Sequence, residues 1–252
     1  MPHVNIRGVR LEFERIVSSA SQRPTIVMLH EGLGSIALWR DFPSRLAAAT
    51  GATVVLYSRR GYGRSDALAG PRAVDYMHKE ALQVLPSLLD ELQIERPVLF
   101  GHSDGASIAL IHAGGSGRSV AGVVAMAPHV MVEDLSVASI TAAREAFRST
   151  GLRERLSRYH RDVDAAFWSW NNIWLDRAFR NWNIEAFLPH IRCPILAIQG
   201  LQDEYGTLEQ VGAMSRQAPH FEQLLLNNCR HSPHRDQPEA VLERVTSWLK
   251  DL

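Results

Sequence analysis

Short runs of apolar residues alternate with longer amphipathic stretches along the 252-residue chain. A strand that helices cover on both faces is apolar along its whole length, whereas a strand with one exposed face alternates. The pattern therefore predicts an α/β fold, with a mostly parallel, twisted sheet and helices on both of its faces. The alternating stretch 9–16 predicts a half-buried first strand, and further strands are expected at 25–29, 53–57, 97–100, 120–125, 194–198 and 221–226.

One long segment, residues 134–189, interrupts this rhythm. It has helical periodicity and no strand pattern, and it holds four of the six tryptophans. We interpret it as a helical cap inserted between two strands of a core made of residues 1–133 and 190–252. Elsewhere, amphipathic helices are expected over 77–92, with a kink at Pro86, and at the C-terminus, where Pro238 suits a first helical turn.

Composition excludes several classes of protein. Lys plus Arg and Asp plus Glu both number 27, so the net charge of zero gives no reason to expect a nucleic-acid or membrane partner. Two cysteines are too few for a disulfide scaffold, and the longest uncharged apolar run, 120–128, is too short to span a bilayer. The first residues lack a signal-peptide pattern, so we expect a cytoplasmic protein. Whether it forms a homodimer stays open.

A nucleophile elbow is indicated at residues 101–105, which read Gly-His-Ser-Asp-Gly. This G-x-S-x-G sequence follows an apolar run and precedes a helical stretch, the strand–turn–helix context that exposes a nucleophilic serine. Ser103 would then lie at the C-terminal edge of the sheet, with the first N–H groups of the next helix directed at developing negative charge. Ser103 is therefore the candidate nucleophile.

A serine nucleophile needs a base and an orienting carboxylate. Asp203 lies just past the apolar run 194–198, with Glu204 as the competing carboxylate one residue farther out. The loop after residues 221–226 carries His231 and His234, so a histidine there completes the set. All three groups are expected at the same edge of the sheet.

The whole chain resembles the α/β-hydrolase serine hydrolases. Residues 29–35, Leu-His-Glu-Gly-Leu-Gly-Ser, are similar to the family's oxyanion loop, with Glu31 where glycine is commoner. Residues 58–66 resemble D-x-R-G-x-G-x-S, with Ser58 in place of Asp. Residues 231–238 resemble the family's histidine motif, with Arg230 and Asp236 in place of Gly and Glu.

The resemblance implies that His231, rather than His234, is the base, and that no cofactor or metal is required. It implies an oxyanion hole made by the backbone N–H of Asp104 with that of Gly32 or Leu33. The expected reaction is hydrolysis of a small carboxylic ester or thioester through an acyl-enzyme. His30 and the cap residues Trp168, Trp170 and Trp174 are the candidate pocket residues, although structural roles for His30 and His102 are also consistent with the sequence.

Asp104 is a further candidate for substrate binding. The elbow and residues 127–148 are most similar to the valacyclovir hydrolase branch, in which the matching Asp binds the α-amino group of amino-acid esters. The alternative is an Asp stabilised by the helix N-terminus.

Other functions are less consistent with these residues. Cys229, His231 and His234 lack a second pair of ligands at zinc-like spacing. Dehalogenases and epoxide hydrolases require a carboxylate at the position of Ser103, and a non-catalytic receptor on this fold would typically lose the nucleophile or the base. A C–C bond hydrolase or cofactor-free perhydrolase would keep the same three residues, so both remain alternatives.

Overall fold

Eight strands form one sheet in the computed structural model, which describes residues 2–18 and 23–252. Their order across the sheet is β1-β2-β4-β3-β5-β6-β7-β8. The pairs β1–β2 and β2–β4 are antiparallel, and all pairs from β4 to β8 are parallel. The strands are β1 (His3–Ile6), β2 (Val9–Ile16), β3 (Ile26–Leu29), β4 (Val54–Tyr57), β5 (Val98–His102), β6 (Gly122–Met126), β7 (Ile195–Gly200) and β8 (Phe221–Leu226).

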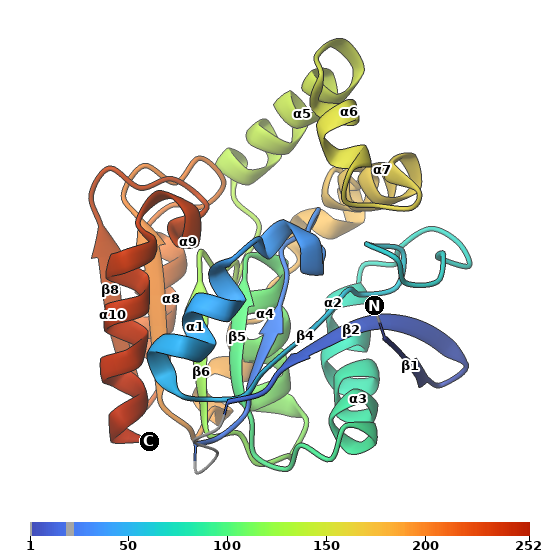
Figure 1. Ribbon diagram of the computed structural model, residues 1–252. Coiled ribbons are helices and arrows are strands. Elements are labelled where there is room, and N and C mark those ends of the chain that lie inside the picture. The colour runs from blue at the N-terminus through green and yellow to red at the C-terminus, as the bar shows by residue number, and fades with distance from the viewer. Residues whose placement is uncertain (1, 19–22) are drawn as a thin grey trace.

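Helices cover both faces of the sheet (Figure 1). The α-helices are α1 (Phe42–Thr50), α2 (Tyr76–Lys79), α3 (Leu85–Glu91), α4 (Asp104–Gly115), α5 (Asp134–Ser149), α6 (Leu152–Ser157), α7 (Val163–Trp174), α8 (Glu209–Gln217), α9 (Pro233–Asp236) and α10 (Pro238–Trp248). A π-helical turn, η2 (Glu80–Val84), joins α2 to α3, and short 3₁₀ turns are η1 (Ile36–Trp39), η3 (Arg177–Asn181), η4 (Glu185–His190) and η5 (Leu249–Asp251).

Alternate residues of each inner strand enter different hydrophobic clusters. In β3, Val27 and Leu29 pack in the cluster that contains α4, whereas Ile26 and Met28 pack in the cluster that contains α1 and α10. Successive side chains of a strand point to opposite faces, so an inner strand must be apolar throughout to contribute to both cores. The sheet is thus buried between two helical layers, as the continuous apolar runs predict.

The expected strands are all present, and their ends agree with the expected ones to within two residues. β1 was not expected, because only Val4 and Ile6 of its four residues are apolar and so short a pattern carries little signal. Pro86 lies in the first turn of α3, directly after the π-helical turn, and Pro238 lies in the first turn of α10 as expected.

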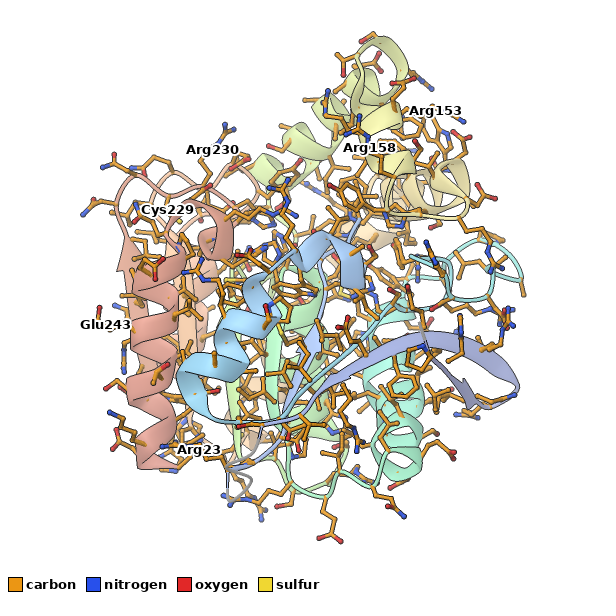
Figure 2. The ribbon with its side chains drawn as sticks, in the orientation of Figure 1. Arg23, Arg153, Arg158, Cys229, Arg230 and Glu243 are labelled. Atoms are coloured by element: carbon orange, nitrogen blue, oxygen red, sulfur yellow. The ribbon has the colours of Figure 1, made fainter. Side chains whose placement is uncertain are left out.

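The segment between β6 and β7 contains α5, α6, α7, η3 and η4. Figure 1 shows α5, α6 and α7 beyond one end of the sheet, the end where α9 also lies. Arg153 on α6 and Arg158 just after it are exposed (labelled in Figure 2), and Arg153 pairs with Asp164 of α7. Of the helices that the structure describes, none has the length and apolar content needed to cross a membrane.

Candidate active site

Ser103 lies in a tight turn between β5 and α4. Its backbone has φ 53° and ψ −119°, a conformation that L-residues rarely adopt, and its N–H donates to the carbonyl of Met126 at 2.9 Å. A Cβ added to Gly105 would lie 2.0 Å from the carbonyl oxygen of Leu29, and one added to Gly101 would lie 2.3 Å from that of Gly105. The two glycines of the motif are therefore required by close backbone approach on either side of the serine.

His231 lies in the loop between β8 and α9 and connects Ser103 to Asp203. Its Nε2 is 3.0 Å from Ser103 Oγ, and its Nδ1 is 2.8 and 2.9 Å from the two carboxylate oxygens of Asp203. A carboxylate only accepts hydrogen bonds, so Nδ1 carries the proton and Nε2 is free to accept from the serine hydroxyl. This is the protonation pattern that a general base needs.

Both oxygens of the Asp203 carboxylate accept further hydrogen bonds besides those from His231. Oδ1 accepts from the backbone N–H groups of Tyr205 at 2.8 Å and Gly206 at 3.2 Å, and Oδ2 accepts from Gln199 Nε2 at 2.7 Å. The competing Glu204 instead accepts from the backbone N–H of His231 at 3.1 Å and pairs with Arg230. Asp203, and not Glu204, therefore orients the imidazole ring.

These contacts move the pKa values in opposite directions. Burial alone would lower the pKa of His231, but the charge and hydrogen bond of Asp203 outweigh burial and raise this pKa above its ordinary value. Burial likewise opposes ionisation of Asp203, yet His231 and the Tyr205 N–H lower the pKa of this carboxyl. The pair stabilises an imidazolium next to a carboxylate, which is the charge state formed after proton transfer from a serine.

His234 does not contact Ser103. Its buried ring packs on Trp39 at 4.8 Å and His102 at 5.0 Å between centroids, and burial keeps the pKa of His234 well below its ordinary value. The register taken from the family motif thus selects the histidine that the structure places at the serine.

The loop 31–34 forms a tight turn beside the serine. The N–H of Gly34 donates to the carbonyl of Glu31 at 3.0 Å, which leaves Gly32 and Leu33 at the two central positions. Within the described ranges 2–18 and 23–252, no acceptor takes the backbone N–H of Gly32, Leu33 or Asp104. The oxyanion hole is expected to use the N–H of Asp104 with that of Gly32 or Leu33, so every candidate donor is free in the described part of the chain.

A cavity of about 110 Å³ opens above Ser103. Besides Ser103, it is lined by Glu31, Gly32, Leu33, His102, Asp104, His129, Ile140, Trp170, Trp174, Tyr205, His231 and Ser232. Two of the expected pocket tryptophans, Trp170 and Trp174, are therefore in place. Trp168 instead lines a separate groove with the loop 68–72, and its ring packs on Phe147 and Phe167.

His30 also differs from its expected place in the pocket. Its ring is fully buried, accepts from the backbone N–H of Arg59 at Nε2 and donates from Nδ1 to the carbonyl of Glu31. His30 thus stabilises the loop 31–34 and does not line the cavity, which agrees with the structural role that the sequence also allows for this residue.

Some residues of the cavity were not expected from the sequence. His129 and Tyr205 follow β6 and β7, so the strand-end argument that selects Asp203 also applies to them. Ile140 lies on α5, and no local pattern marks it as a cavity residue. Burial, together with a smaller contribution from the charge of His231, lowers the pKa of His129 to about 3, so this ring is neutral.

The substituted family motifs are compensated locally. Ser58 stands where the family has Asp, and its hydroxyl donates to Glu12 Oε2 at 2.8 Å, so β2 supplies a carboxylate at this place. Asp236 stands where the family has Glu, and it accepts from the backbone N–H of Arg230 at 2.7 Å. Both departures keep a charged hydrogen-bond acceptor beside the site loops.

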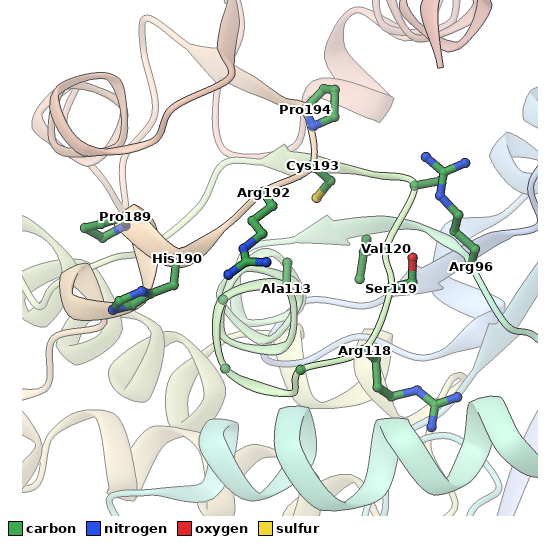
Figure 3. Close-up of a pocket in the computed structure, with 14 residues that line it drawn as sticks. Arg96, Ala113, Arg118, Ser119, Val120, Pro189, His190, Arg192, Cys193 and Pro194 are labelled. Carbon is green, nitrogen blue, oxygen red and sulfur yellow. The ribbon is translucent and has the colours of Figure 1, made fainter.

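A larger groove, of about 810 Å³, is formed by segments that lie before β5, β6 and β7 (Figure 3). In Figure 3 the side chains of Arg96, Arg118 and Arg192 point in different directions and do not converge. None of the residues that line it belongs to the Ser103–His231–Asp203 chain. Among residues 2–18 and 23–252, no group of three or more His, Cys, Asp or Glu side chains could hold a metal ion.

Comparison with known proteins places the chain in a family. The model of the alpha/beta hydrolase family matches residues 26–244, most of the chain. The chain belongs to the alpha/beta hydrolase family, and it is a hydrolase.

Individual relatives show the range of activities on this fold. The chain is 27% identical to a proline iminopeptidase of Levilactobacillus brevis, over 89% of this chain and 87% of the relative. It superimposes on the enol-lactonase of Burkholderia xenovorans LB400 with a TM-score of 0.78 at 18% identity, covering 99% of this chain and 100% of the other. The proline iminopeptidase of Mycobacterium smegmatis gives a TM-score of 0.74 at 17% identity, covering 99% and 97%. At such identities the two structures show a shared fold alone.

Proposed function

We propose that the protein is a serine hydrolase that cleaves a small carboxylic ester or thioester through an acyl-enzyme. The observation that carries the proposal is the 3.0 Å contact between His231 Nε2 and Ser103 Oγ, while His231 Nδ1 donates a hydrogen bond to Asp203. His231 takes the proton as Ser103 Oγ attacks the carbonyl carbon, and then gives a proton to the leaving oxygen or sulfur. Water, activated by the same ring, attacks the acyl-enzyme and releases the acid.

The tetrahedral oxyanion of each step is placed between two backbone segments. The N–H of Asp104 begins α4, and the N–H groups of Gly32 and Leu33 lie at the centre of the turn 31–34. One such donor contributes roughly 3 kcal/mol to transition-state stabilisation in related chemistry.

The cavity favours a small substrate without negative charge. Leu33, Ile140, Trp170 and Trp174 supply an apolar wall, whereas the carboxylates of Glu31 and Asp104 line the side near Ser103 and no Lys or Arg lines the cavity. Anionic acyl groups would meet the Glu31 carboxylate there and would find no free cation among the described residues, because Arg59 lies behind the cavity wall and pairs with Asp104.

The test of this function is active-site labelling followed by a substrate panel. A fluorophosphonate probe should label the wild type at Ser103, and Ser103→Ala should abolish both labelling and hydrolysis. The panel comprises p-nitrophenyl esters, acyl-CoA thioesters, amino-acid esters and proline p-nitroanilide, because one relative is named an iminopeptidase. Labelling without turnover of any ester or thioester would favour the C–C hydrolase or perhydrolase alternative, and the absence of labelling would favour a receptor.

Asp104 is the proposed recognition group for an α-amino acyl substrate. Its Oδ2 accepts from Tyr76 at 2.6 Å and lies 3.6 Å from Arg59 Nη2, whereas its buried Oδ1 has no partner among the described residues. Oδ1 therefore keeps a free acceptor position beside the nucleophile. The measurement is kcat/KM for an α-amino ester against its des-amino analogue, in wild type and in Asp104→Asn. A preference for the amine that is lost in the variant supports recognition, and no preference in the wild type contradicts it.

A further inference from the structure

Arg59 is a buried arginine beneath the active-site cavity. It follows β4 by two residues, its side chain is 2% exposed, and it does not line the cavity itself. Burying a guanidinium costs free energy unless its donors and its charge are satisfied. The groups that accept hydrogen bonds from Arg59 and pair with its charge therefore show which segments this residue holds in place.

Its guanidinium joins the two segments that supply the oxyanion donors. Nη1 donates to the carbonyl of His30 at 2.9 Å, and Nη2 donates to the carbonyl of Glu31 at 3.0 Å. The same Nη2 lies 3.6 Å from the Oδ2 atom of Asp104, the residue after the nucleophile. One planar, rigid group thus contacts both sides of the expected oxyanion hole.

The contact with the Glu31 carbonyl has a consequence for the neighbouring N–H. In a planar trans peptide, the carbonyl oxygen of Glu31 and the N–H of Gly32 point in opposite directions. Three donors, namely Arg59 Nη2, His30 Nδ1 and the N–H of Gly34, converge on this carbonyl. Fixing the carbonyl toward the buried guanidinium directs the Gly32 N–H away from it, and Gly32 is a residue of the cavity wall.

We propose that Arg59 is a positioning residue that sets the orientation of the Gly32 N–H, and its separation from the Asp104 N–H, for oxyanion stabilisation. This role rests on the proposed serine hydrolase function. Arg59 does not touch substrate, and its effect passes through the peptide that joins Glu31 to Gly32. Because oxyanion donors act mainly in the transition state, losing the alignment should lower kcat and leave KM nearly unchanged.

The test compares Arg59→Met and Arg59→Lys with a matched control, Arg72→Met. Arg72 stacks on the ring of Tyr62, as Arg59 does, and on that of Tyr76. It donates to the carbonyl of Arg60, and none of its contacts within the described part of the chain reaches loop 31–34. Rates for p-nitrophenyl acetate are expressed per active site, titrated with the fluorophosphonate, so that loss of folded protein does not alter them. Affinity for a trifluoromethyl ketone, whose adduct with Ser103 carries an oxyanion, gives a second measurement.

We expect Arg59→Met to lower kcat about 10- to 100-fold, the scale of a misaligned catalytic group, and to weaken ketone binding in parallel. Arg59→Lys keeps the positive charge but loses the planar pair of Nη donors, so its kcat should fall by a smaller factor. This variant also serves as the test if Arg59→Met does not fold. Arg72→Met should keep the wild-type kcat.

An unchanged kcat per titrated site in both Arg59 variants would overturn the positioning role while leaving the proposed function intact. An equal loss in Arg72→Met would also overturn it, since the effect would not be specific to the oxyanion segments. Absence of labelling in the wild type would overturn the proposed function and this role together.

Discussion

The Nε2 atom of His102 donates a hydrogen bond to the backbone carbonyl of His231 at 2.7 Å. The residue that precedes Ser103 therefore anchors the loop that carries His231, and the rings of His102 and His231 lie 5.3 Å apart between centroids. The Ser103–His231 distance thus depends on a second contact between the same two segments.

Removing this anchor should slow catalysis without removing any reacting group. His102→Leu loses the donor, and we expect kcat to fall about tenfold or more because the His231 ring is held less well for proton transfer. His102→Gln can still donate to the carbonyl and should recover part of the loss. Wild-type kcat in the leucine variant, measured per titrated site, would show that the anchor is dispensable.

The two histidines of the 231–234 loop should differ sharply. His231→Ala removes the base, and we expect kcat to fall by several orders of magnitude because the three residues act as a unit. His234→Ala removes a ring that packs on Trp39 and His102, so its main effect should be a lower melting temperature. Initial rates and thermal unfolding of both variants separate the roles, and the reverse ranking would mean that His234 is the base.

Much of the site could be predicted because it follows from sheet topology. Ser103, Asp203 and His231 follow β5, β7 and β8, and the carboxyl ends of parallel strands meet at one edge. The apolar runs therefore place the three loops at one edge although Ser103 and His231 lie 128 positions apart, whereas the choice of His231 over His234 came from the resemblance to the family's histidine motif.

The cap residues could not be predicted in the same way. Trp168 and Trp170 are two positions apart on α7, yet only Trp170 reaches the cavity. Which face of α7 is directed at Ser103 depends on how the helices between β6 and β7 pack on the rest of the chain, and helical periodicity does not specify that packing. Arg59 was missed for a related reason, since Ser58, Arg59 and Arg60 all follow β4 and the sequence does not indicate that Ser58 and Arg59 are the buried ones.

The pH dependence should follow the His231–Asp203 pair. The base must be neutral to accept the serine proton, and Asp203 raises the pKa of His231 above its ordinary value of 6.5. kcat/KM should therefore fall as the pH decreases through a value above 6.5. Glu31 contributes to the same increase, so Glu31→Gln should move this acid limb to lower pH. Glu239→Gln should not move it, because this side chain is exposed at the start of α10. An acid limb that does not move in Glu31→Gln would contradict the assignment.

The cap tryptophans should separate substrate binding from stability. Trp170→Ala and Trp174→Ala enlarge the cavity, and we expect KM to rise about tenfold, equivalent to about 1.4 kcal/mol of lost contact. Trp168→Ala should lower the melting temperature and leave KM unchanged, because this ring lines a different groove. Unchanged KM in all three variants would assign the tryptophans to the core alone.

Gly32 should be irreplaceable because of its contact with Trp170. A Cβ at this position would lie 2.2 Å from the indole Nε1, so either the cap or the turn 31–34 must move. We expect Gly32→Ala to lower kcat/KM about 100-fold, the cost of displacing an oxyanion donor by roughly 1 Å. In a Trp170→Ala background the collision is absent, so the same substitution should cost much less, and a double-mutant cycle measures the difference. Gly70→Ala is the control, since its added Cβ meets nothing within 4 Å. Equal costs in the two backgrounds would show that Gly32 is required for its backbone alone and not for the close approach of the cap.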